Sequence, residues 1–204
     1  MATYSTTSVI NYALVLCGAN TVSTITDDTP NARALNSVYD FCRKNFLTDN
    51  KWAFSTTRST LSTVATTTFA YLQNDESFVY TKPTGSLRIW EVSAPGSIWR
   101  EEGDYIASNS ANLGVKFSFD QTDHTKWQPA AVEAFCYKLA SEIAFQIMNS
   151  ATKAESLKKF YEEVKLPQAM IKNSQTGDQQ QVLDDSWEGS KYGYTGGDPS
   201  RSYS

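Results

Sequence analysis

The sequence lacks the long apolar runs and the excess of positive charge that mark several common classes of protein. No apolar run approaches the ~18 residues that a membrane-spanning helix needs. The segment Met1–Ser5 has no basic residue, so we expect neither a secretory signal nor a membrane anchor. With 18 Lys and Arg against 22 Asp and Glu, the net charge of −4 argues against a sequence-nonspecific grip on DNA. A mildly acidic protein can still surround DNA, because a lining that repels phosphates lets them slide.

Cysteine is also scarce, and its positions predict neither a disulfide nor a metal site. Cys17, Cys42 and Cys136 lie far apart, and each falls within an apolar helical pattern. An odd number of cysteines on apolar stripes favours free thiols in the core of a protein from a reducing compartment. No pair has the CxxC spacing, and no His/Cys cluster suggests a metal ion.

Histidine occurs once, and this limits the catalytic chemistry that the chain can support. His124 lies in the polar connector 120–126, between a strand pattern and a helix pattern. Asp123 is beside it, but the nearest candidate nucleophile, Cys136, belongs to an apolar stripe. We therefore expect His124 to be a solvated loop residue. No nucleotide-binding or hydrolase motif occurs, so the sequence predicts no enzyme, no cofactor and no metal centre.

The length of 204 residues and the hydrophobic content of 40% are typical of a globular protein. Two helix patterns come first in the chain. The first pattern starts near Thr6 or Thr7 and stops at Gly18, a residue suited to a left-handed C-terminal cap. The second starts at Thr29-Pro30, a hydroxyl N-cap followed by proline at the first helical position. Its apolar residues recur at helical spacing and form one face: Leu35, Val38, Tyr39, Cys42 and Phe46.

Residues 55–126 have the composition of a β region. Val115–Asp120 alternates strictly and predicts a strand with one wet face, and Leu87–Val92 alternates less cleanly. Turns are expected at three Gly-containing motifs: Thr84-Gly85, Pro95-Gly96 and Glu102-Gly103-Asp104. We expect this region to fold as a small antiparallel sheet or a compact sandwich. The Ser/Thr-rich stretch 55–68 is compatible with a strand or with a loop along a neighbouring subunit.

Two further helix patterns follow Trp127. Pro129 begins the first of these helices. The small alanine side chains of this helix allow a partner helix to approach closely. Thr152–Glu155 matches a capping box at the start of the last helix. Pro167 should kink or end that helix, because it removes a backbone donor and crowds the carbonyl group of Glu163.

The segment from Gly177 onward differs in composition from the rest. It holds five glycines, few aliphatic residues, and five acidic against two basic side chains. Such a segment buries too little apolar surface to fold by itself. Its aromatic residues have no core of their own to fill, so we predict that they bind another protein chain: Trp187, Tyr192, Tyr194 and Tyr203.

The order of these patterns predicts an α+β fold. Two N-terminal and two C-terminal helices would close into one four-helix bundle, with an inserted small antiparallel β domain and an extended C-terminal arm. The predicted parts are 1–54, the N-terminal helical half; 55–126, the β domain; 127–176, the C-terminal helical half; and 177–204, the arm.

Short motifs in a set order run through roughly residues 8–177. The N-terminal block contains Ile10-Asn11, Leu14, Gly18, Ile25, Ala32, Tyr39, Arg43, Leu47, Trp52 and Phe54. The middle block contains Tyr80–Pro83, Leu87–Ile89, Val92 and Trp99, and the last contains Pro129, Ala134, Leu139, Ala140, Ala144 and Tyr161. None of these motifs is specific alone. Taken together, the order and spacing of these motifs resemble those of the tail tubular protein A family. The members of this family are the head-to-tail adaptors or connectors of short-tailed bacteriophages.

The resemblance implies a structural virion protein. Such a protein assembles in the host cytoplasm as a homo-oligomeric ring, a dodecamer, at the head–tail interface. The ring docks to the portal protein above and to the tail nozzle, a tail tubular protein B-like protein, below. It joins the tail to the capsid and leaves a channel through which genomic DNA passes without specific binding, and it has no membrane partner. Pro167 departs from the family pattern, and nothing beyond Gly177 matches it.

Two other classes of function are compatible with the residues. The first is a monomeric cytosolic module whose β region binds a small ligand or a peptide in a pocket within one chain. The second is an enzyme, which would need a convergent polar site around His124.

Overall fold

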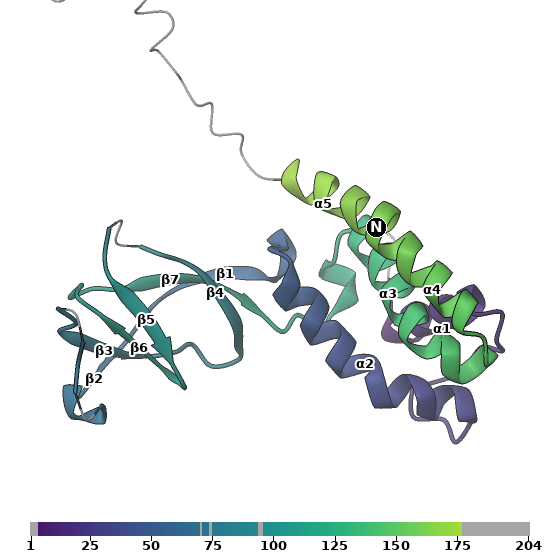
Figure 1. Ribbon diagram of the computed structural model, residues 1–204, viewed down its shortest axis with the longest axis horizontal. Coiled ribbons are helices and arrows are strands. Elements are labelled where there is room, and N and C mark those ends of the chain that lie inside the picture. Colours follow the sequence, from purple (N-terminus) through teal and green to yellow (C-terminus); the bar gives the residue numbers. More distant parts are fainter. Residues whose placement is uncertain (1–3, 70, 74, 94–95, 177–204) are drawn as a thin grey trace, which may run out of the picture.

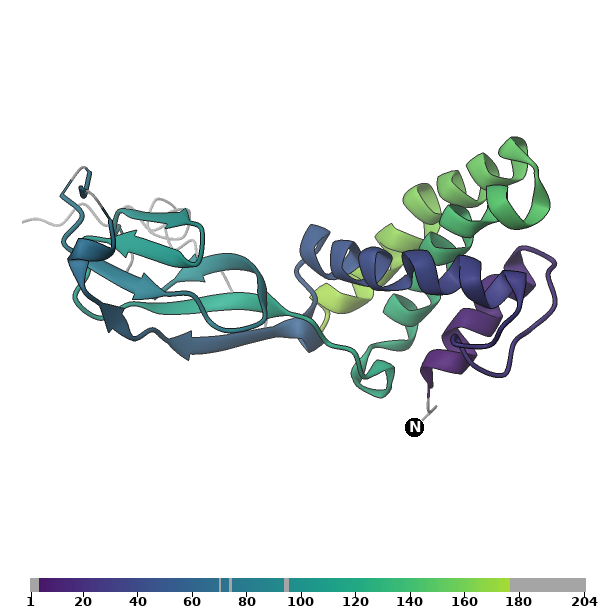
Figure 2. The same cartoon turned by 90° about the horizontal axis from the view of Figure 1, so that it is seen from below.

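The computed structural model describes residues 4–69, 71–73, 75–93 and 96–176, which form a helical half and a β half joined end to end (Figures 1 and 2). The helices are α1 (Thr6–Leu16), α2 (Pro30–Asp49), α3 (Pro129–Met148), α4 (Ala151–Phe160) and α5 (Leu166–Ser174). The strands are β1 (Thr56–Thr60), β2 (Thr63–Val64), β3 (Phe78–Thr81), β4 (Ser86–Val92), β5 (Trp99–Glu102), β6 (Tyr105–Ser108) and β7 (Gly114–Phe119). Short 3-10 turns are η1 (Ala53–Ser55), η2 (Thr66–Thr68) and η3 (His124–Lys126), and η4 (Tyr161–Lys165) is a π-helical turn.

The first helix begins and ends where the sequence predicts, and the second begins where it predicts. Ser5 caps α1, and Gly18 follows its end with φ of +70°, the left-handed conformation that favours glycine. Thr29 caps α2 by accepting a 3.2 Å hydrogen bond from the amide of Ala32. Between the helices, the Asn11 side chain bonds both backbone groups of Val22 at 2.9 Å, which holds the connecting loop against α1.

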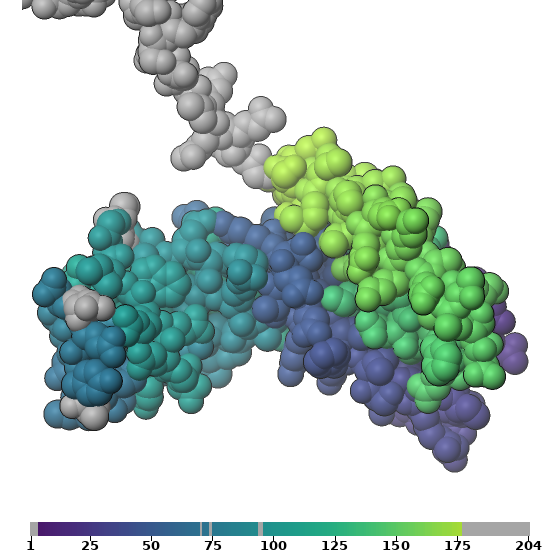
Figure 3. All heavy atoms as spheres, in the orientation of Figure 1, coloured from purple at the N-terminus to yellow at the C-terminus, as the bar shows by residue number. Residues whose placement is uncertain are grey.

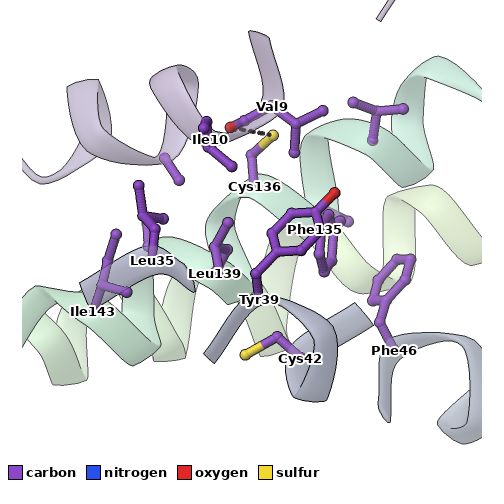
Figure 4. Close-up of a cluster of buried hydrophobic side chains, with 14 of the residues drawn as sticks. Val9, Ile10, Leu35, Tyr39, Cys42, Phe46, Phe135, Cys136, Leu139 and Ile143 are labelled. Carbon is purple, nitrogen blue, oxygen red and sulfur yellow. Dashed lines mark hydrogen bonds between the residues drawn. The ribbon is translucent and has the colours of Figure 1, made fainter. Parts of the chain in front are cut away.

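The predicted four-helix bundle is wrong, because the helices pack around α3 and do not close into a ring of neighbours. The extensive helix–helix contacts of the described chain each pair α3 with α1, α2, α4 or α5. Helix α3 can take this central place since it is apolar on most sides. Its alanines let the other helices approach closely and are fully buried: Ala131, Ala134, Ala140 and Ala144. Figure 4 shows Phe135, Cys136, Leu139 and Ile143 of α3 between residues of α1 and α2.

The last helix continues through Pro167, which does not end it. The π-helical turn Tyr161–Lys165 precedes this proline, and the amide of Leu166 bonds the carbonyl group of Tyr161. The wider turn offers a way to pass a residue that has no amide hydrogen. The capping-box prediction at the start of this helix is also wrong, because Ser150 is the N-cap and Thr152 lies inside α4.

The β half is a sandwich of two antiparallel sheets, larger than the small domain that the sequence predicts. One sheet has the strand order β1-β7-β4 and the other β2-β3-β6-β5. The Ser/Thr-rich stretch supplies β1 to the first sheet and β2 to the second. Buried residues from both sheets form a separate core: Tyr80, Ile89, Ile106, Leu113, Val115 and Phe117.

Candidate functional site

The junction between the two halves contains a largely buried ion pair. The Arg43 guanidinium, on α2, donates from Nε and from the second terminal nitrogen to both carboxylate oxygens of Asp120, at 2.8 and 2.9 Å. Asp120 directly follows β7, so this bidentate pair joins the helical half to the end of a central strand. Arg43 also donates to the exposed Asp40 carboxylate at 2.6 Å. The exposed fraction is 8% for the Arg43 side chain and 24% for the Asp120 side chain, so the pair is mostly shielded from water and stronger than a surface pair.

His124 lies in the core beside this ion pair, which overturns its predicted place in a solvated loop. The residue is 2% exposed, and its Nε2 atom shares a hydrogen bond with the Tyr39 hydroxyl. Burial, together with the nearby Arg43 charge, lowers the pKa of His124 to about 4. Burial also raises the pKa of Tyr39. At neutral pH both groups are therefore uncharged, and the pair fixes the connector between β7 and α3 against α2.

Stacked aromatic rings fill the space next to these polar contacts. Phe46 stacks on Trp52 at a centroid distance of 4.7 Å and on Trp127 at 5.7 Å, and Phe54 stacks on Trp127 at 4.9 Å. The indole nitrogen of Trp52 donates to the carbonyl oxygen of Phe46 at 2.9 Å. Rigid rings of this size bury much apolar area and adopt few conformations, so the cluster resists bending at the junction.

Four polar contacts at the edge of the junction add further connections. Arg88 of β4 donates to the carbonyl oxygen of Thr48 at 3.3 Å. Lys51 forms an ion pair with Glu91 of β4. Asn173 of α5 bonds the backbone of Lys51 and of Ala53, both at 2.9 Å. Helices α2 and α5 are thus both attached to the β half or to the segment that leads into it.

Exposed apolar side chains occur on both halves, and they are candidates for contact with other chains. In the helical half they are Tyr12, Val15, Phe41, Phe145, Phe160 and Ile171, and in the β half they are Tyr71 and Ile98. Phe41 is 69% exposed and Tyr71 is 71% exposed, which is unusual for aromatic rings. The helical half and the β half, which carry these residues, meet near the end of α5 (Figure 3).

The described part of the chain contains no cluster of three or more His, Cys, Asp or Glu that could hold a metal ion. None of its helices is long and apolar enough to cross a membrane. Cys17, Cys42 and Cys136 are buried free thiols, as predicted, and burial raises the pKa of each. The predicted partner-binding residues lie outside the described residues: Trp187, Tyr192, Tyr194 and Tyr203.

The sequence interpretation missed the buried polar network because its members are 77 and 85 positions apart. One signal was present. Arg43 follows Tyr39 by four residues on α2, so a cation falls next to the apolar stripe, where a charge needs a partner.

Comparison with protein-family models finds no match for the sequence, and comparison with curated proteins finds none either.

Proposed function

We propose that this protein is a head-to-tail adaptor of a short-tailed bacteriophage, a structural ring subunit between the portal and the tail nozzle. The proposal begins with the resemblance of its ordered motifs to the tail tubular protein A family. An adaptor works by holding two partners in register, so its subunit needs a fixed shape and more than one contact surface.

The observation that carries the proposal is the junction. Four of the residues that carry the resemblance meet there: Tyr39 and Arg43 in the buried polar network, and Trp52 and Phe54 in the ring cluster. They hold the helical half and the β half at one angle. A rigid two-part subunit suits a ring that must transmit the position of the portal to the nozzle.

The exposed apolar residues support the same proposal. Subunits of a ring touch their neighbours through two different faces, a heterologous contact that closes by rotation. Phe41 and Phe145 on the helices and Tyr71 on the β half offer apolar area on separate parts of the surface. Desolvated aromatic residues are typical anchors of such interfaces.

In this proposal the C-terminal segment extends the contact area. Trp187, Tyr192, Tyr194 and Tyr203 would bind the portal protein or an adjacent adaptor subunit. An arm of this kind strengthens attachment because, once the body has docked, binding of the arm is intramolecular. The genomic DNA passes through the ring, and the net charge of −4 agrees with a channel that does not hold it.

A deletion of the coding sequence in the phage genome tests the proposed function. Particles made without the protein should package DNA but fail to retain it or to acquire a tail, and expression of the protein in trans should restore tails. Normal, tailed and infectious particles without the protein would exclude an adaptor role. A purified protein that stays monomeric and binds a ligand in its β half would favour the small binding module.

A further inference from the structure

A basic groove lies where the end of α5 meets the start of β1. Its volume is about 390 Å³, and its lining includes Lys51, Arg58, Lys116, Asn173 and Thr176. A second groove of about 340 Å³ shares Arg58 and Lys116 with it and is also lined by Glu91 of β4. The two grooves therefore adjoin over the face of the sheet on which these three residues are neighbours in register. The ribbon views agree in placing the end of α5 next to the start of β1 (Figures 1 and 2).

Strand β1 forms one side of the face that carries this groove, and its outer edge is unpaired. It is the outermost strand of the order β1-β7-β4, and no described residue pairs with its outer side. The amide of Leu61 bonds the carbonyl oxygen of Leu113 at 2.9 Å, in the register that pairs Ser59 with Val115. Because paired residues of antiparallel strands alternate, the amides of Arg58 and Thr60 point away from β7. Such an edge can accept another extended segment.

The charge of the groove indicates what kind of segment fits. Glu91 is the one acidic residue of its lining, and it is already paired with Lys51 and, at 3.7 Å, with Lys116. Arg58 has no ion pair with any residue that the structure describes. The groove therefore has an excess of positive charge and suits an acidic strand.

The chain itself supplies such a segment at this point. Thr176 lines the groove, and the next residues carry the acids Asp178, Asp184 and Asp185. Across residues 177–204 there are five acidic and two basic side chains. A segment attached this close has an effective concentration on the order of millimolar, so even a weak site would be filled.

We propose that the outer edge of β1, beside the groove, is the docking site of the chain's own C-terminal segment, whose acidic stretch Asp178–Asp185 adds to it as an extended strand. Backbone hydrogen bonds provide the pairing, and Arg58, on the strand next to the added segment, selects an acidic one. Docking leaves the aromatic residues from Trp187 onward free for another chain. The inference rests on the groove and the edge strand, so it stands or falls independently of the adaptor function.

Amide hydrogen exchange of the full-length chain tests this docking. In the wild-type protein the outward amide of Thr60 should exchange roughly tenfold more slowly than in a full-length Asp178→Lys/Asp184→Lys/Asp185→Lys variant, because an amide exchanges only when its hydrogen bond opens. The amide of Ser59, which bonds β7, should exchange equally slowly in both proteins and so reports an intact sheet.

Charge variants of the groove complete the experiment. Arg58→Glu should remove the slow exchange of Thr60, and combining it with Asp184→Lys/Asp185→Lys should restore part of it. Lys158→Glu makes the same charge change on α4 and should have no effect. Equal exchange of Thr60 in the wild-type and triple-variant proteins would overturn the proposal. Slow exchange that disappears on dilution would overturn the assignment to the same chain and indicate the segment of a second copy.

Discussion

Arg43 and Asp120 form a two-pronged ion pair, 2.8 and 2.9 Å long, that joins helix α2 to the end of strand β7. The Arg43 guanidinium lies 5.5 Å from the centre of the Tyr39 ring, which belongs to the buried Tyr39–His124 pair. This ion pair is important for the shape of the molecule because few other side-chain contacts join the helical half to the β half. Their relative orientation depends on this small set of side chains.

Removal of one partner of this pair should destabilise the protein strongly. Asp120→Ala leaves the Arg43 charge mostly buried with only the exposed Asp40 beside it, and we expect a loss of about 2–3 kcal/mol in the free energy of unfolding. The matched control is Asp40→Ala, which removes a carboxylate from the same guanidinium. The Asp40 side chain is 74% exposed, so its loss should cost less than about 1 kcal/mol. Urea denaturation measures both, and equal losses would contradict the assigned roles.

Stability should fall as the pH is lowered from about 6.5 toward 5. The unfolded chain protonates His124 near pH 6.5, whereas the folded protein keeps it neutral down to a pKa of about 4. Acid therefore favours the unfolded state, and stability present above pH 6.5 is lost as the pH falls through this window. The loss should be about 1–2 kcal/mol between pH 6.5 and 5.

His124→Gln provides the control for this pH effect. His124 is the one histidine of the chain, so the variant should show a much flatter dependence over the same range, although it is less stable at pH 7. A wild-type protein whose free energy of unfolding does not change between pH 7 and 5 would show that His124 is not buried as a neutral group.

The elements were predictable from the sequence where the signals were local. The caps at Thr29 and Gly18, the proline at the start of α3 and the alternation in β7 each depend on neighbouring residues, and each places its element correctly. The arrangement of the helices was not predictable in the same way. Apolar stripes say which face of a helix is buried, but not which helix occupies the centre, and α3 takes it because it is apolar on several faces.

The buried network shows the same limit at the level of single residues. A polar connector rich in Asp, Thr and Lys surrounds His124, so its local sequence predicts exposure. The fold overrides this tendency because Trp127 and Phe135 enclose the imidazole and Tyr39 supplies a hydrogen bond. The hydrogen bond comes from Tyr39, 85 positions away in the chain. The partner-binding assignment of Trp187, Tyr192, Tyr194 and Tyr203 stays a prediction.

Phe46 and Phe41 allow the core to be separated from the surface on one helix. Phe46 and Leu139 are both fully buried. Phe46→Ala should lower the free energy of unfolding by about 3–5 kcal/mol, and Leu139→Ala should lower it by about 2–5 kcal/mol. Phe41 is 69% exposed, so Phe41→Ala should hardly change the melting temperature. If Phe41 lies in a ring interface, its replacement should instead weaken assembly on heads. A large fall in melting temperature for Phe41→Ala would mean that the exposed face of α2 is wrongly assigned.

The C-terminal segment should contribute to attachment and little to folding. Cutting the chain after Gly177 should leave the circular-dichroism spectrum and the melting of the body almost unchanged while weakening attachment to portal-bearing heads. Trp187→Ala should reproduce part of this loss, because interface anchors cost about 2 kcal/mol or more when truncated. A truncated protein that binds heads with undiminished affinity would assign docking to the folded body alone.

The most direct test of the adaptor proposal is cryo-electron microscopy of tailless, portal-bearing heads mixed with the purified full-length protein. The proposal predicts a ring of added density directly beneath the portal, twelvefold if the family resemblance extends to stoichiometry. The helical half and the β half should fit each subunit of that ring in the orientation that the Arg43–Asp120 junction sets. Heads that remain bare at saturating concentrations of folded protein would contradict the account.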